Sequence, residues 1–305
     1  MSDRFSYSRV DVFSQCGFKY KLRYVDKHYV NSDSLATELG SAIHKTEEAI
    51  ANTIASGGSI DYIGLKNKLI LTYVELEHKY AEAFMTADKS NRTCKDKLFE
   101  YLTTGIYRLE NFLMANQHLK VIATEKEFEF TIFETVFHGF IDRVLYDTKN
   151  NKYIVQDIKT YPVPVEKKNL AVPLQFVIYS LAMKELYGVD PADIECSYDL
   201  PFCNIIQKAG EADFVAKGVE KLHELLNSID NNDFVPKPTP LCHWCEYCPT
   251  NPNQEEAAKN LCPYYSLWTR ENKTHQVACK WEGIENHELV LFEYIKCQNN
   301  KQKAV

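Results

Sequence analysis

The stretch KYIVQDIKT at residues 152–160 places an aspartate and a lysine, Asp157 and Lys159, two residues apart within a run of β-forming residues. Alternate side chains of a strand share a face, so both charges point to the same side. A solvent-facing edge strand with an ion pair is the ordinary explanation for a single D-x-K. A carboxylate beside an ammonium group can also hold a metal ion and stabilise a developing oxyanion. The neighbouring strand decides between the two.

The preceding β-rich segment supplies a second carboxylate. If a four-residue hairpin loop follows Asp147, that residue pairs with Lys152. Asp142 then lies opposite Asp157 on the same face, with about 5 Å between the Cβ atoms. Two such carboxylates repel each other unless a cation lies between them, and Mg²⁺ or Mn²⁺ suits hard oxygen ligands. The hairpin therefore favours a metal site at which Lys159 supports the attack of water.

These strand motifs resemble the PD-(D/E)XK nuclease superfamily, in its RecB-like branch. GFIDRV is similar to the G-x-x-D element of that branch, with Asp142 as the aspartate. VQDIKT is similar to the D/E-x-K element, with Asp157 and Lys159. The resemblance covers residues 1–265 and implies an α/β fold: a small mixed β-sheet flanked by helices, with a restriction-endonuclease-like core.

Two helical motifs extend the resemblance. LGSAIHKTEEAI resembles the upstream helix, in which His44 is implied as an additional metal ligand, although a single histidine on a helix is more often structural. PLQFVIYSLAM matches the Q-x-x-x-Y motif, with Gln175 and Tyr179 one turn apart. Taken alone, such a tyrosine is usually a core residue and such a glutamine usually faces solvent. The alternating Glu125, Glu127 and Glu129 are expected to face solvent from the first strand, with the approach of one of them to the site as the alternative.

Four cysteines between residues 242 and 262 form C-x2-C-x2-C-x13-C, a density typical of a metal site. A self-contained zinc site would use Cys242, Cys245, Cys248 and Cys262. The resemblance implies a [4Fe–4S] cluster instead, in which Cys16 joins Cys242, Cys245 and Cys262 and Cys248 is left over. Both interpretations stay open from the sequence.

The periodicity of the chain predicts the elements that position these residues. Helical patterns cover about 35–55, 62–86 and 94–118, strands follow from 124, and a helix ending at Gly188 separates two strand regions. We therefore divide the chain into four parts: a helical region with Cys16 and His44 (1–120), a nuclease core (121–235), a cysteine-rich metal-binding element (236–270) and a C-terminal segment (271–305).

Length and composition restrict the class of protein. The 305 residues are 45% hydrophobic, enough to bury one large core. No window approaches 18 consecutive apolar residues and the first residues lack a secretory signal, which predicts a cytoplasmic protein that does not bind a membrane. A net charge of −7 still allows a local basic surface, since residues 1–30 hold six Lys and Arg against three Asp.

The sequence thus predicts a divalent-metal-dependent deoxyribonuclease, an exonuclease acting on DNA ends or single strands in phage-type recombination or repair. His44, Asp142 and Asp157 would hold Mg²⁺ or Mn²⁺, while Lys159, Gln175 and Tyr179 complete the catalytic set. DNA is the expected partner, with a recombination or replication protein as a further one. The alternatives are a nuclease that trims new spacers in CRISPR adaptation and a non-catalytic DNA-binding scaffold.

Overall fold

The computed structural model describes residues 4–30 and 34–239, together with 242, 244–248, 251, 258, 261–268 and 275–279. The chain forms two compact units. The first, called the core unit, consists of Met1–Asp11 and Asp33–Asn231, and the second unit consists of Val12–Ser32 and Asn232–Val305. Among the described residues, no helix has both the length and the apolar character needed to cross a membrane.

A five-stranded mixed sheet lies at the centre of the core unit, in the order β1-β2-β3-β4-β5. Its strands are β1 (Leu119–Ile132), β2 (Thr135–Asp147), β3 (Lys152–Ile158), β4 (Glu195–Leu200) and β5 (Ile205–Ala209). Neighbouring strands are antiparallel except β3 and β4, which are parallel. The parallel pair requires a crossover, and α9 (Leu174–Tyr187) provides it. The predicted small mixed sheet flanked by helices is therefore confirmed.

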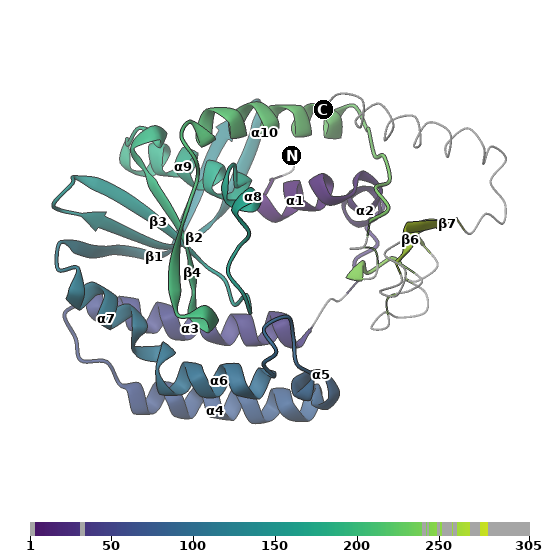
Figure 1. The fold of residues 1–305 in the computed structure, drawn as a ribbon. Coiled ribbons are helices and arrows are strands. Elements are labelled where there is room, and N and C mark those ends of the chain that lie inside the picture. Colours follow the sequence, from purple (N-terminus) through teal and green to yellow (C-terminus); the bar gives the residue numbers. More distant parts are fainter. Residues whose placement is uncertain are drawn as a thin grey trace. The chain divides into compact units, whose positions relative to one another are not determined.

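Helices cover the sheet from both sides (Figure 1). On one side α3 (Leu35–Ala55) lies next to the sheet and packs against α4 (Tyr62–Lys79). On the other side lie α9 and α10 (Phe214–Asp230). The remaining helical elements of this unit are α5 (Ala81–Met85), α6 (Cys94–Thr103), η2 (Gly105–Tyr107), α7 (Arg108–Ala115), α8 (Lys167–Leu170), η3 (Pro191–Asp193) and η4 (Pro201–Cys203).

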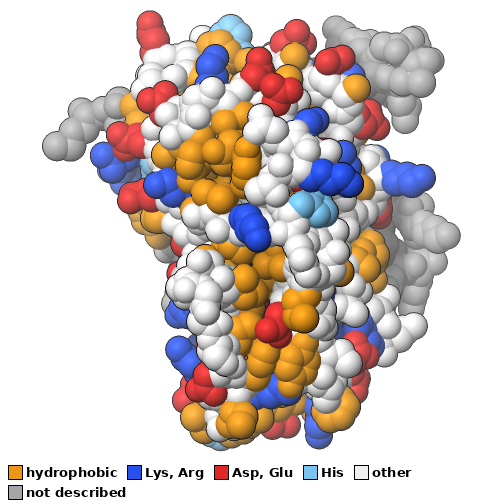
Figure 2. All heavy atoms as spheres, turned by 90° about the vertical axis from the view of Figure 1, so that its left-hand side faces the viewer, with side chains coloured by type: hydrophobic (Ala, Val, Ile, Leu, Met, Phe, Trp, Pro, Cys, Tyr) orange, Lys and Arg blue, Asp and Glu red, His pale blue; other side chains and the backbone are white. Residues whose placement is uncertain are grey.

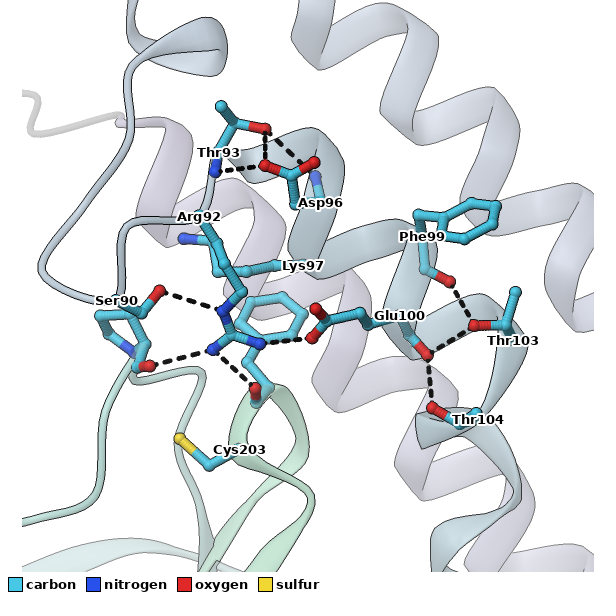
Figure 3. Close-up of polar contacts among 12 residues, drawn as sticks. Ser90, Arg92, Thr93, Asp96, Lys97, Phe99, Glu100, Thr103, Thr104 and Cys203 are labelled. Carbon is cyan, nitrogen blue, oxygen red and sulfur yellow. Dashed lines mark hydrogen bonds and ion pairs between the residues drawn. The ribbon is translucent and has the colours of Figure 1, made fainter.

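Local signals explain several helix ends. The Ser34 hydroxyl accepts a hydrogen bond from the Thr37 N–H at the start of α3. Thr93 and Asp96 form a capping box at the start of α6 (Figure 3). Gly188 ends α9 in the left-handed region, where glycine has no steric penalty. The predicted single helix over 62–86 is instead divided at Tyr80 into α4 and α5. No glycine or proline lies near Tyr80 in the sequence to indicate this break.

The second unit brings an N-terminal segment together with residues from the other end of the chain. It contains α2 (Gly17–Tyr20), the π-helical turn η1 (Lys21–Val25) and an antiparallel pair, β6 (Tyr264–Trp268) and β7 (His275–Cys279). The rings of Tyr20 and Phe234 stack at 5.9 Å between centroids. Lys19 and Arg23 both form ion pairs with Glu246. The helix α1 (Tyr7–Gln15) contributes residues to both units.

Candidate active site

The predicted hairpin between β2 and β3 is present, since Asp147 pairs with Lys152. Strand pairing continues only to Arg143 and Gln156, so Asp142 lies just where the two strands separate. There the Ile158 N–H donates to Asp142 Oδ2 at 2.7 Å. The carboxylate thus replaces the main-chain acceptor that the ladder no longer supplies.

The glycine of the G-x-x-D element has a packing role. Gly139 pairs with Phe128 on β1, and a Cβ at Gly139 would lie 2.9 Å from the Phe128 ring. Any larger residue would push this ring away, so glycine allows the close approach of the two strands three residues before Asp142.

Asp157 is fully buried and is held by charged and polar neighbours. Lys159 Nζ lies 3.0 Å from Asp157 Oδ1 and 2.7 Å from Oδ2. From α9, Gln175 Nε2 donates to Asp157 Oδ1 at 2.7 Å and to the Tyr179 hydroxyl at 2.9 Å. Gln175 therefore contacts the D-x-K element directly, Tyr179 is joined to it through Gln175, and both side chains are buried.

Burial dominates the electrostatics of the site. It raises the pKa of Asp157 to about 6, although Lys159 opposes the shift. It also raises the pKa of Asp142 to about 6, against the Ile158 hydrogen bond and Lys159. Burial lowers the pKa of His44, so its imidazole is neutral near pH 7. Burial opposes the charge of Lys159 as well, but Asp157 outweighs this and raises the lysine pKa, which keeps the ammonium charged.

A candidate metal-binding group forms around Asp142. Potential ligand atoms of His44, Glu125 and Asp142 all lie within 4.8 Å of one another, and His44 Nδ1 is 3.7 Å from Asp142 Oδ2. Asp157 is not part of this group, and Lys159 and Gln175 contact its carboxylate. The structure thus brings together His44 and Asp142, two of the three predicted metal ligands, and adds Glu125.

Glu125 had been expected to face solvent with Glu127 and Glu129, and this prediction was wrong for Glu125 alone. Glu127 and Glu129 are exposed, whereas Glu125 is half-buried. A register irregularity between Val121 and Ala123 precedes it, and Glu125 itself adopts a φ of 43°. Residues on both sides of Glu125 pair with residues on both sides of Asp142, which places the two acids opposite each other. Strand alternation alone cannot reveal such a distortion.

Four charged side chains form a buried network next to the site: Glu47, Arg108, Arg143 and Asp199. Arg143 Nη1 lies 2.8 Å from Asp199 Oδ2, and its Nη2 lies 3.3 Å from Glu47 Oε2. Arg108 pairs with the same two acids. Two guanidinium groups and two carboxylates leave the network neutral, which is the arrangement that burial of charges requires.

Two members of this network, Glu47 and Arg143, lie on elements that also carry a site residue. Glu47 follows His44 by one turn of α3, and Arg143 follows Asp142 on β2. Gln156, which accepts from Arg143 Nη1 at 3.1 Å, precedes Asp157 on β3. The network therefore fixes α3, β2 and β3 relative to one another, and with them the candidate ligands.

Arg92 anchors the segment that follows Lys159. Its Nη2 donates to the carbonyl oxygens of Pro162 at 3.1 Å and Phe202 at 3.0 Å. Its Nε donates to the Ser90 hydroxyl at 3.1 Å, and it forms an ion pair with Glu100 (Figure 3). No motif pointed to Arg92, because its partners are main-chain carbonyl groups far away in the sequence.

The cysteines of interest belong to the second unit. Burial raises the pKa of the Cys262 thiol, and the nearby Cys245, Cys16 and Cys242 raise it further. Burial likewise raises the pKa of Cys245 to about 12. Cys262 therefore lies near three of the other clustered thiols, one of them from the N-terminal segment.

Known proteins give one strong similarity and several distant ones. A search among curated proteins finds no match. A solved structure from Eubacterium rectale, described as a "Putative exonuclease", is 11% identical, aligns with 83% of this chain and 90% of its own, and has a TM-score of 0.45. The structure of SSO0001 is 19% identical, aligns with 60% of this chain and 80% of its own, and has a TM-score of 0.27. A family model for the PD-(D/E)XK nuclease superfamily matches residues 4–251, and the chain therefore belongs to that superfamily.

Proposed function

We propose that this chain is a divalent-metal-dependent deoxyribonuclease that hydrolyses phosphodiester bonds at DNA ends or in single strands. The observation that carries this proposal is the grouping of His44, Glu125 and Asp142 within 4.8 Å of one another, beside the contact between Asp157 and Lys159. Carboxylates are the ligands that Mg²⁺ and Mn²⁺ prefer, and a neutral imidazole is a common metal ligand. A non-catalytic scaffold would not need this set intact.

The side chains have separate roles in the proposed reaction. His44, Asp142 and Asp157 would hold the divalent cations, with Glu125 as an added ligand. Such cations supply a water of lowered pKa and neutralise the phosphate that is attacked. Neutral His44 is in the form that binds metal, and the raised carboxylate pKa values reflect negative charges buried together, which a cation relieves.

Lys159 and the α9 pair act on the reacting groups from the other side. The Lys159 ammonium stays charged and would orient the nucleophile or stabilise the negative charge that develops on the phosphoryl oxygens. Gln175 holds one oxygen of Asp157, and Tyr179 holds Gln175. In this arrangement Gln175 and Tyr179 orient Asp157 and do not themselves exchange protons.

The direct test is cleavage of end-labelled DNA by the purified chain with Mg²⁺ or Mn²⁺. Lys159→Ala should lower the rate more than about 100-fold while the chain stays folded, because it removes a charge and not a packed apolar group. Lys68→Ala, at an exposed lysine of α4, is the matched control and should cleave like the wild type. Near-wild-type turnover by Lys159→Ala would refute the site assignment.

The second unit suggests a RecB-like, iron–sulfur type of nuclease. Cys245, Cys16 and Cys242 lie near enough to Cys262 to raise the pKa of its thiol, and this proximity supports a [4Fe–4S] cluster that these four residues would hold. Such a cluster would order this unit and take no redox part in cleavage. The alternative is structural Zn²⁺ with Cys248 as a ligand.

Metal analysis after anaerobic purification separates the two. The cluster predicts about four irons per chain, and loss of iron in Cys16→Ala but not in Cys248→Ala. Full metal content in Cys16→Ala together with metal loss in Cys248→Ala would establish the zinc site instead.

We further propose a role in phage-type recombination or repair, beside a recombination or replication protein, with spacer trimming in CRISPR adaptation as the alternative.

A further inference from the structure

A hollow of about 500 Å³ lies beside His44 in the core unit. The residues that matter for its chemistry are Thr37, Gly40, Ser41, His44 and Lys45 of α3 and Glu125 of β1. The α3 residues recur about one helical turn apart, so they form one face of the helix. Thr37, Ser41 and Lys45 are exposed, whereas the faces of α3 toward the sheet and α4 are packed.

The lining of this hollow suits a sugar–phosphate backbone. Thr37 and Ser41 provide hydroxyl groups, and Lys45 provides an ammonium group. Groups of these kinds contact phosphate and sugar oxygens in protein–DNA complexes. The described residues that line the hollow include no large apolar side chain, which argues against an apolar ligand.

The acidic part of the lining coincides with the candidate metal group. Glu125 is one of the potential ligands. Burial raises its pKa, and the nearby Glu48, one turn beyond His44 on α3, raises it further. Without a cation these carboxylates would repel a phosphate. A divalent cation at His44, Glu125 and Asp142 would neutralise the two carboxylates of this group, so that a phosphate could approach.

The segment that follows Lys159 lies close to the same helix face and carries an exposed tyrosine. A Cβ at Gly40 would be 3.3 Å from Thr160 Oγ1, so α3 closely approaches the segment that follows Lys159. The next residue, Tyr161, is 46% exposed. Aromatic side chains beside a backbone track stack on unpaired bases, whose faces are not accessible within a duplex.

We infer that this hollow, called here the α3 groove, holds the backbone of one DNA strand and that Tyr161 stacks on an unpaired base of that strand. The inference rests on the proposed function and narrows its substrate to single-stranded DNA. A volume of about 500 Å³ is that of a site for a small ligand, which suits one or two nucleotides and not the width of a duplex.

Binding of a short fluorescein-labelled oligo(dT) strand to the full chain tests this inference, with Ca²⁺ in place of Mg²⁺ to limit cleavage. Lys45→Glu and Ser41→Asp should each weaken binding about tenfold or more, because both place a negative charge beside a phosphate. Lys45→Gln should also lower the slope of log K against log salt by about 0.7, the value for one lost phosphate contact on a single strand.

Two matched controls separate local contact from general effects. Lys68→Glu makes the same charge change as Lys45→Glu, at an exposed lysine of α4 outside the groove, and should leave binding unchanged. Tyr161→Phe keeps the ring and should bind like the wild type, whereas Tyr161→Leu should lose about 5- to 150-fold in affinity. Circular dichroism of each variant verifies that it is folded.

The inference fails if Lys45→Glu and Lys68→Glu weaken binding equally, or if blunt duplex competes as well as oligo(dT). It is also overturned if Tyr161→Leu binds like Tyr161→Phe. Binding with the expected losses but no cleavage in Mg²⁺ or Mn²⁺ would leave the groove in place and refute the proposed nuclease. If the wild type cleaves DNA but the groove variants bind it as tightly as the wild type does, the proposed nuclease stands and the α3 groove is refuted.

Discussion

Replacement of Arg143 by methionine is the sharpest test of how the candidate site is supported. Arg143 is fully buried and contacts Asp199, Glu47 and Gln156 through its two terminal nitrogens. Removing one partner of a buried ion pair costs about 3–5 kcal/mol, because the remaining carboxylates lose compensation while they stay buried. For a domain of this size that corresponds to a fall of roughly 6–20 °C in the melting temperature.

The same substitution should also weaken metal binding. A loss of stability alone would not weaken it at temperatures where the variant is still folded. Arg143 fixes β2 against β3 and α3, so its loss lets Asp142 move relative to His44. The assay is urea unfolding of the metal-free protein, followed by titration of folded protein with Mn²⁺ observed by electron paramagnetic resonance. We expect weaker Mn²⁺ binding at a temperature where the variant is still folded.

An exposed ion pair gives the matched control. Lys168 and Glu166 lie 2.7 Å apart, but their side chains are 77% and 68% exposed. Lys168→Met should therefore change the free energy of unfolding by less than about 1 kcal/mol. The double variant Glu47→Gln, Arg143→Met should recover part of the loss, since it removes an acid that Arg143→Met leaves undercompensated. An Arg143→Met protein within about 1 kcal/mol of the wild type, with unchanged Mn²⁺ affinity, would refute the positioning role.

Three further predictions concern the site itself. Gln175→Ala should lower the cleavage rate with little change in melting temperature; a large loss of stability with normal specific activity would identify Gln175 as a core residue only. Glu125→Gln should weaken Mn²⁺ binding about tenfold or more in a calorimetric titration, and an unchanged affinity would remove Glu125 from the ligand set. For metal-free protein, the raised pKa values of Asp142 and Asp157 mean that the folded state binds protons more tightly than the unfolded state. The contribution of these two groups to stability should therefore be greatest below about pH 4 and should fall as the pH rises through about 6. The double variant Asp142→Asn, Asp157→Asn should flatten this pH dependence of the free energy of unfolding, as measured with urea.

The sequence was sufficient where local rules determine geometry. The β2–β3 hairpin follows from turn residues between two β-rich segments, and its register places Asp142 and Asp157 at the same end. The helix over Leu35–Ala55 was predicted at its observed bounds, because its apolar residues recur at helical spacing and Ser56, Gly57 and Gly58 follow its end. Neither inference required knowledge of long-range packing.

Other features depend on tertiary contacts that no local pattern encodes. Glu125 reaches the metal-binding group through a distorted strand position with a positive φ, which is uncommon for residues other than glycine. The division of the predicted 62–86 helix at Tyr80 accompanies full burial of Phe84 and a hydrogen bond from the Tyr80 hydroxyl to Glu38. In the sequence, Arg143 and Glu47 look like any surface charges.

The alternation of β2 and β3 explains why catalytic and supporting charges can be so close without interfering. Asp142 and Arg143 are consecutive on β2, and Gln156 and Asp157 are consecutive on β3, so each strand sends one member to either side. On one side the acids are buried in the absence of a cation, which raises their pKa values and disfavours the charged form. On the other side a neutral network of two arginines and two acids joins the same strands to α3. Because the network resists the separation that repulsion between the acids would cause, the site can remain assembled before any cation binds.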